Sequence, residues 1–190
     1  MGAKGEHKKE MILKAAEELF VEKGFSSVTM QDICNKMGIS RGGLYRYYPS
    51  TAEIFINIIN KEQENALAQL KRANANNIPA IKIMNVFLLD RFNRFSDRRY
   101  NLENAMSDFA AKYPDGKKVL QERADRAIQI VSSIIIKGVE EGDMKCNDPE
   151  STAITIMSIL EGLAKHHDLL PLHTDEILRQ RHFILNMVTK

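Results

Sequence analysis

Residues 29–48, TMQDICNKMGISRGGLYRYY, decide the fold of this chain. Thr29, followed three residues later by Asp32, predicts a capped helix start, because each side chain can accept a hydrogen bond from the other residue's backbone amide. Four apolar residues then recur at helical spacing: Met30, Ile33, Cys34 and Met37. Gly38 predicts the end of this helix, and Ser40 predicts the cap of the next. The stretch therefore predicts two short helices joined by a tight turn.

The second of these helices, expected over 41–48, carries glycines in its first turn. Gly42 and Gly43 each cost about 1 kcal/mol in a helix relative to alanine. A first turn without side chains can bring its backbone amides against phosphates or base edges. Charge and hydroxyl groups around this bare end come from Arg41, Tyr45, Arg46 and Tyr47. The pattern indicates a helix that enters a groove of DNA, and the alternative is a glycine-weakened surface helix.

The region from about Glu10 to Phe55 resembles the N-terminal DNA-binding domain of the TetR family of bacterial transcriptional regulators. The motifs that carry the resemblance are ILKAAEELFVEKGF, GFSSVTMQDI, MGISRGGLYRYY and PSTAEIF. By that resemblance the positions nearest to bases are Arg41, Gly42, Gly43 and Arg46. The implied phosphate partners are Thr29, Tyr45 and Tyr47, and Gln31 is a further candidate contact.

One position departs from the family pattern. The family commonly has a lysine just after the small residue that caps its fourth helix, whereas here Thr51 follows Ser50. The cationic phosphate contact expected there is missing. Ser50 and Thr51 can still hydrogen-bond a phosphate, more weakly than a charged group would.

Composition limits the class of protein. The chain has 190 residues, 44% of them hydrophobic, which is enough for a sizeable core. It shows no signal peptide and no run of about 18 apolar residues, so we expect no membrane association and a cytoplasmic location. Cys34 and Cys146 are too few for a disulfide framework, and we expect one in the core and one in a loop.

The sequence offers no catalytic constellation, and we expect neither an enzyme nor a bound cofactor. The histidines His166, His167 and His173 form the one cluster that resembles metal ligands. Adjacent histidines on a helix point about 100° apart, so we interpret them as a polar helix end and predict no metal site.

The net charge of +2 is concentrated at one end. Residues 1–48 hold 8 Lys and Arg against 6 Asp and Glu, whereas residues 49–190 hold 19 of each kind. Lys4, Lys8 and Lys9 can extend a phosphate-binding patch. The interpretation that we favour for these lysines is a disordered, solubilising tail.

Helical spacing continues through the rest of the chain and predicts an all-α protein. A first helix ends at Gly24, and a long helix runs from Ser50 to about Arg72. Later helices are expected over 79–95, 100–112, 115–142, 149–168 and 174–188. We expect a helix-turn-helix domain over 1–49, joined by the long helix to a ligand-binding and dimerisation bundle over 50–190.

The last two helices are apolar around more than one face, which predicts pairing with a second copy. The interface residues that we expect are Ile156, Leu160, Leu163, Ile177, Ile184 and Val188. The alternative is that one intramolecular bundle covers every apolar face. A two-fold dimer would place two recognition helices about 34 Å apart, which suits a palindromic operator in double-stranded DNA.

The middle of the chain is rich in bulky, adaptable side chains. Residues expected to line a ligand cavity are Met84, Leu88, Phe92, Met106, Phe109 and Tyr113. The alternative is a filled core, and the family resemblance favours a small-molecule effector. Together these features predict a homodimeric repressor that a ligand releases from DNA. The rival classes are a helical-bundle enzyme or small-molecule-binding protein, and a DNA-binding protein without ligand response.

Overall fold

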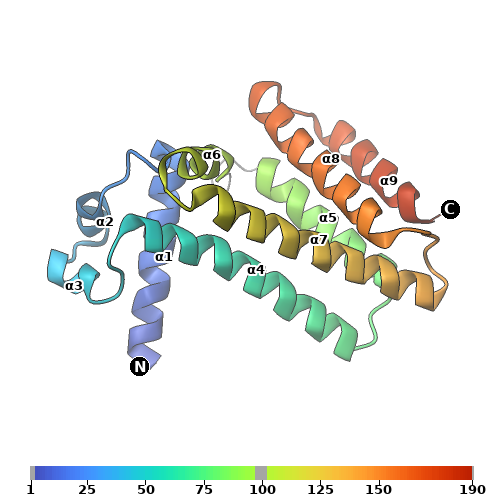
Figure 1. Ribbon diagram of the computed structural model, residues 1–190, viewed down its shortest axis with the longest axis horizontal. Coiled ribbons are helices and arrows are strands. Elements are labelled where there is room, and N and C mark those ends of the chain that lie inside the picture. The colour runs from blue at the N-terminus through green and yellow to red at the C-terminus, as the bar shows by residue number, and fades with distance from the viewer. Residues whose placement is uncertain (1–2, 97–101, 190) are drawn as a thin grey trace. The chain divides into compact units, whose positions relative to one another are not determined.

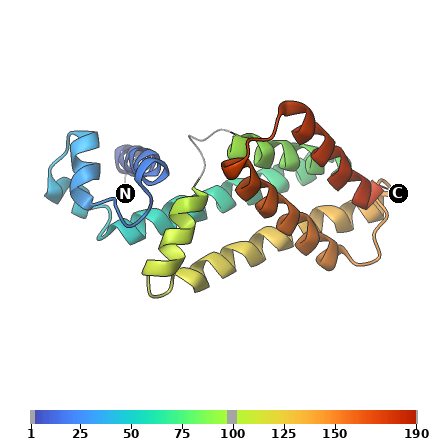
Figure 2. The ribbon, with the colours of Figure 1, turned by 90° about the horizontal axis from the view of Figure 1, so that it is seen from above.

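The computed structural model describes residues 3–96 and 102–189, and within these ranges the protein is all-helical (Figures 1 and 2). The described residues form α1 (Ala3–Lys23), α2 (Met30–Met37), α3 (Arg41–Tyr45), α4 (Thr51–Ala75), α5 (Ala80–Ser96), α6 (Glu103–Lys112), α7 (Gly116–Glu141), α8 (Pro149–Leu169) and α9 (Thr174–Thr189). The all-α prediction is confirmed. Residue 100, where one helix was expected to begin, lies outside the described residues.

The chain divides into two compact units. The first unit comprises the described residues of 1–62 and 98–123, and the second comprises those of 63–97 and 124–190. α4 and α7 each contribute residues to both units. This division differs from the boundary expected after residue 49, because α6 and the start of α7 belong to the first unit.

An aromatic cluster explains why α6 belongs to the first unit. Phe109 is fully buried, and its ring centroid lies 4.9 Å from that of Phe25, 5.0 Å from that of Phe55 and 4.9 Å from that of Tyr113. The same core contains residues of α1, α2 and α4. α6 also packs against α1 (Figure 2).

A polar contact reinforces this packing at the loop after α1. The Ser26 amide and hydroxyl donate to the two Asp108 carboxylate oxygens, at 2.5 and 2.7 Å. These two bonds hold the pKa of the Asp108 carboxyl below its ordinary value. α6 is therefore tied to the first unit by both apolar and polar contacts.

The second unit is built around α5, which packs against α8 and α9. Its core contains four residues expected at a dimer interface, each at most 2% exposed: Ile156, Leu160, Ile184 and Val188. That expectation is wrong for these four, because their side chains are already covered within one chain. The other two, Leu163 and Ile177, are half-buried and pack against the same core.

Local sequence signals predicted most helix ends to within a few residues of their positions in the structure. Asp148 caps α8 by accepting a hydrogen bond from the Ser151 amide at 3.0 Å, and Pro149 occupies the first helical position, as expected. The disordered-tail interpretation is wrong, since α1 begins at Ala3 and includes Lys8 and Lys9. The side chain of Lys4 lies outside the described part of the chain.

The two cysteines lie as the sequence indicated. Cys34 is buried and Cys146 is half-buried. Within the described residues, no group of three or more His, Cys, Asp or Glu side chains is arranged to hold a metal ion. His167 Nδ1 instead accepts a hydrogen bond from the Leu172 amide at 3.0 Å, just after α8. Among the helices described, none combines the length and apolar character needed to cross a membrane.

Candidate nucleic-acid interface

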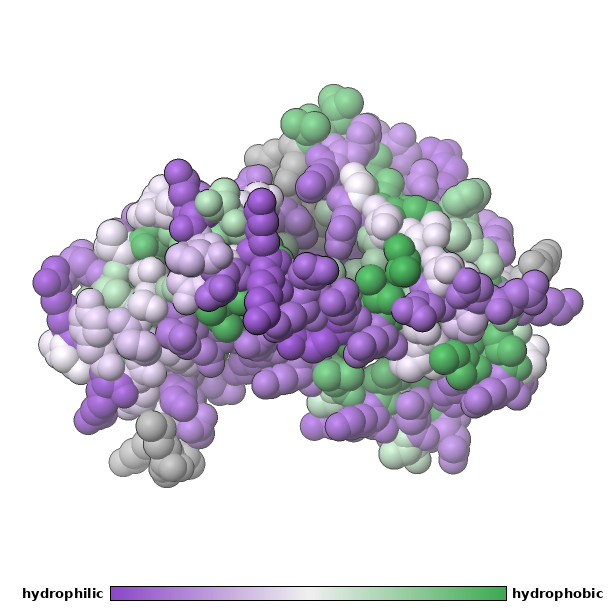
Figure 3. Space-filling view, in the orientation of Figure 1, coloured by the Kyte–Doolittle hydropathy of each residue, from purple (hydrophilic) through white to green (hydrophobic). Residues whose placement is uncertain are grey.

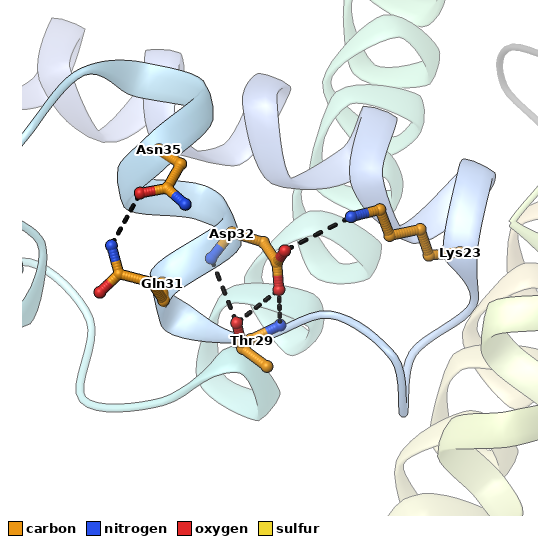
Figure 4. Close-up of polar contacts among 5 residues, drawn as sticks. All are labelled: Lys23, Thr29, Gln31, Asp32 and Asn35. Atoms are coloured by element: carbon orange, nitrogen blue, oxygen red, sulfur yellow. Dashed lines mark hydrogen bonds and ion pairs between the residues drawn. The ribbon is translucent and has the colours of Figure 1, made fainter.

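α2 begins at a reciprocal hydrogen-bonded cap (Figure 4). The Asp32 amide donates to Thr29 Oγ1 at 3.1 Å, the Thr29 amide donates to Asp32 Oδ2 at 2.8 Å, and the Thr29 hydroxyl bonds the same carboxylate. Lys23 Nζ lies 3.4 Å from Asp32 Oδ1. Bonds from the Thr29 hydroxyl and amide, with Lys23 beside them, lower the pKa of Asp32 to about 2. The carboxylate therefore stays charged at the positive end of the α2 dipole.

The turn between α2 and α3 follows from two local features. Gly38 has φ of 63°, in the left-handed region that favours glycine, and ends α2. Ser40 Oγ then accepts a hydrogen bond from the Gly43 amide at 3.2 Å and caps α3. Leu44 and Tyr48 are buried and hold α3 on the core. The tight turn predicted from the sequence is confirmed.

The outward face of α3 carries side chains at both ends and none between. Arg41, Tyr45 and Arg46 are exposed, with 51% of Tyr45 accessible to solvent. Gly42 is exposed between them, and a methyl group added to it would meet nothing within 4 Å. Its φ is not positive either, so nothing within the folded chain requires glycine at this position. The start of α3 therefore presents open space that no side chain of the folded chain fills.

Polar contacts on this surface link α2 to α3. Arg41 Nε donates to Gln31 Oε1 at 2.6 Å, and Gln31 Nε2 donates to Asn35 Oδ1 at 2.7 Å (Figure 4 shows the second bond). Arg46 Nη2 donates to Tyr47 Oη at 3.2 Å, and Arg46 Cζ lies 5.2 Å from the centre of the Tyr47 ring. Sequence reasoning missed Asn35, although its position four residues after Gln31 is the signal for such a contact.

The start of α4 completes the surface. Ser50 Oγ accepts a hydrogen bond from the Glu53 amide at 3.2 Å, so it caps α4 while its own hydrogen can still be donated. Thr51 is half-buried beside it. All ten residues predicted to contact DNA lie between the cap of α2 and the start of α4, with Arg46 and Tyr47 just after the end of α3, and every one is exposed or half-buried.

The six residues expected to line a ligand cavity do not lie in one core. Met84, Leu88 and Phe92 are buried in the second unit. Met106 and Phe109 are buried in the first unit, where Tyr113 packs against them. Helical spacing placed all six on apolar faces, but it did not indicate which core each helix joins.

Residues 12–58 match the family described as bacterial regulatory proteins, tetR family. The chain belongs to the TetR family. Among curated TetR-type relatives, the helix-turn-helix transcriptional regulator YfiR of Bacillus subtilis is 28% identical over 144 residues, which cover 74% of this chain and 70% of YfiR. The chain is thus a TetR-family DNA-binding transcriptional regulator.

Solved structures share the TetR-family fold over nearly the whole chain. A TetR-family regulator from Rhodococcus sp. has a TM-score of 0.79 at 17% identity and covers 97% of this chain and 100% of its own. SmeT, solved as a complex with triclosan, has a TM-score of 0.76 at 20% identity and covers 96% of this chain and 91% of its own. The similarity therefore extends beyond the helix-turn-helix to the helices of both units.

Proposed function

We propose that this protein is a repressor that binds a palindromic operator as a homodimer and is released by a small molecule bound in its second unit. The observation that carries the proposal is the exposed first turn of α3, where Gly42 leaves open space that the folded chain does not use. In the proposal the protein works by binding rather than by catalysis, in the cytoplasm, where bacterial DNA lies.

The DNA-contacting role of α3 follows from its charge and hydroxyl pattern. Arg41 and Arg46 flank the bare turn, and Tyr45, Tyr47 and Ser50 place hydroxyl groups around it. Cationic and hydroxyl groups of this kind contact phosphates, whereas arginine can also bind a guanine edge. The proposal therefore assigns base contacts to α3 and phosphate contacts to the residues around it.

The direct test compares binding to the upstream promoter DNA of the chain's own gene with binding to random duplex, at two salt concentrations. A sequence-specific regulator binds the promoter more tightly at both, and Arg46→Ala weakens that binding by about 1–3 kcal/mol while changing binding to random duplex much less. Equal affinity for both duplexes would indicate an architectural DNA-binding protein. Failure to bind either at low salt would support a helical-bundle enzyme or carrier instead.

The proposed dimer surface uses the outward faces of α8 and α9 rather than their buried faces. Ile154, Leu178 and Phe183 are 46%, 46% and 62% exposed, and all three are large apolar side chains. At the end of α8, Leu169 is 81% exposed and Leu170 next to it is 65% exposed, and apolar side chains stand out at this end of the surface in Figure 3. Pairing two copies through these faces would remove this apolar area from water.

Sedimentation equilibrium tests the dimer. Phe183→Glu places a charge in the proposed interface and should give a monomer that stays helical but loses affinity for the palindromic site. Glu122→Gln, an exposed polar change on α7 and therefore outside α8 and α9, is the control and should remain dimeric. A Phe183→Glu protein with the dimer mass would exclude this surface.

Release by a ligand is assigned to the second unit. Met84, Leu88 and Phe92 supply adaptable apolar surface in its core, and methionine repacks readily around bound molecules. The triclosan complex of SmeT supports this part of the proposal, because it is a chain of the same fold. α4 and α7 run through residues of both units, so a change in the packing of the second unit can reach the first along these helices.

A thermal-shift screen of apolar small molecules, followed by operator binding, tests the release. An effector must favour the released state by about 5.5 kcal/mol to shift the population from 1:99 to 99:1. If every compound that binds the second unit leaves operator affinity unchanged, the protein regulates without a ligand response.

A further inference from the structure

We infer that Gln31 and Asn35 are positioning residues that hold Arg41 ready to read a guanine in the major groove. The inference rests on the proposed DNA binding and refines it, because it distinguishes the residue that touches the base from the residues that orient it. It also assigns Gln31 to Arg41 rather than to DNA.

The geometry is a chain of two hydrogen bonds on the exposed surface. Asn35 Oδ1 accepts from Gln31 Nε2 at 2.7 Å, and Gln31 Oε1 accepts from Arg41 Nε at 2.6 Å. Asn35 thereby fixes which way the Gln31 amide faces, so that its oxygen points to Arg41. Residues 31 and 35 are one helical turn apart on α2, whose two ends are fixed by the Thr29–Asp32 cap and Gly38.

Holding Arg41 through Nε leaves its other donors available. The guanidinium carries five N–H groups in a planar fork, and Nε supplies only one of them. The two terminal nitrogens remain for a bidentate contact with guanine O6 and N7, which is the commonest specific contact between a side chain and a base. A guanidinium fixed in advance loses less conformational entropy on binding than a freely rotating one.

The neighbours of Arg41 leave room for such a contact. Arg41 is the first residue of α3 and is exposed, and the next two residues are glycines without side chains. A base edge can therefore approach the guanidinium over Gly42, where an added methyl group would meet no atom within 4 Å beyond its chain neighbours and the backbone of its own helix. The arrangement predicts one guanine in each half of the operator, read by Arg41.

Selection from a random duplex pool tests the assignment, because the selection itself yields the operator sequence. The wild-type protein should select a site with a constant guanine in each half, and Arg41→Ala should lose the preference at that position while keeping the others. On the selected site, Arg41→Ala should weaken binding about 5- to 150-fold. Replacing that guanine by 7-deazaguanine, which lacks the N7 acceptor, should weaken wild-type binding but leave Arg41→Ala unaffected.

The positioning role is tested by a double-mutant cycle. Gln31→Met and Asn35→Ala should each weaken binding to the selected site at least about threefold, and neither should weaken it further once Arg41 is alanine. Asn57→Ala removes an exposed amide of α4 that bonds only its own helix at Glu53 O, and serves as the control with unchanged binding.

Three results would overturn the inference. An unchanged selected motif with Arg41→Ala would make Arg41 a phosphate contact. Losses from Gln31→Met that add fully to those from Arg41→Ala would make Gln31 an independent contact with DNA. Tighter binding by Gln31→Met would mean that Gln31 restrains Arg41 from the base. A wild-type chain that selects no motif refutes the proposed function itself, which separates the two failures.

Discussion

Phe109→Ala should destabilise the DNA-binding unit even though Phe109 lies 61 residues beyond Tyr48 in the sequence. Its ring is fully buried and packs against Phe25, Phe55 and Tyr113, with centroid separations of 4.9 to 5.0 Å. Truncating a buried phenylalanine to alanine costs about 3–5 kcal/mol, against a typical total stability of about 5–15 kcal/mol. The first unit should therefore open far more often than in the wild-type protein.

Phe92→Ala is the matched control, because Phe92 is 1% exposed in the core of the second unit. Hydrogen exchange measured by mass spectrometry distinguishes the two variants. Phe109→Ala should accelerate exchange in α1, α2 and α6, whereas Phe92→Ala should accelerate it in α5, α8 and α9. Phe109→Leu keeps most of the side-chain volume and should cost less than about 1.5 kcal/mol. Unchanged protection of α1 and α2 in Phe109→Ala would refute the assignment of α6 to the first unit.

Two further predictions concern charge in the first unit. The pKa of Asp32 is about 2 in the folded protein, below its ordinary 3.8, so its stabilisation is complete above about pH 4 and is lost as the pH falls toward 2. The difference in melting temperature between wild type and Asp32→Ala should accordingly shrink between pH 6 and pH 2, and a constant difference would contradict the cap assignment. Lys8 and Lys9 lie four residues before the buried Ile12 and Leu13, on the side of α1 that packs on the helix-turn-helix. Replacing both by glutamine should reduce the steepness with which the logarithm of the DNA-binding constant falls with the logarithm of salt concentration, by about 1–2. The control pair Lys117→Gln and Lys118→Gln, at exposed positions at the start of α7, should leave this slope unchanged.

Signals carried by neighbouring residues made the helix-turn-helix predictable in detail. The α2 cap, the left-handed Gly38 and the Ser40 cap all depend on contacts within a few residues, so the sequence predicts them directly. α3 ends at Tyr45, earlier than expected, and the sequence carried a signal for part of this difference. Tyr48 precedes Pro49, and a residue before proline disfavours the helical conformation.

Contacts between distant segments were not predictable in the same way. Helical spacing shows that α6 and α8 have apolar faces, but it does not identify the surface that covers each face. Phe109 therefore joined an unexpected core, and Ile156 and Leu160 proved to be buried within one chain. The prediction of a disordered tail at the lysines now found in α1 was wrong for a similar reason. The Lys61–Glu10 ion pair of 2.9 Å, which joins α1 to α4, is invisible to a local reading of charge.

Two glycines that the fold does not require lie on the two proposed partner surfaces, the DNA-binding surface and the dimer surface. Gly42 in α3 and Gly162 in α8 lie within helices without positive φ, and a methyl group added to either would meet nothing within 4 Å. Each is exposed, and each costs about 1 kcal/mol relative to alanine. Since the folded chain supplies no reason for either glycine, we expect a partner to approach closely at both.

The two alanine variants should then separate the partners. Both should match or exceed the wild-type melting temperature, because alanine favours the helix. Gly42→Ala should weaken operator binding while leaving the dimer mass unchanged, since its methyl group meets only DNA. Gly162→Ala should instead weaken dimerisation in sedimentation equilibrium, and its loss of operator affinity should disappear at protein concentrations that restore the dimer. If either variant gains stability and keeps full binding of its partner, the surface around that glycine is not in close contact with the partner assigned to it.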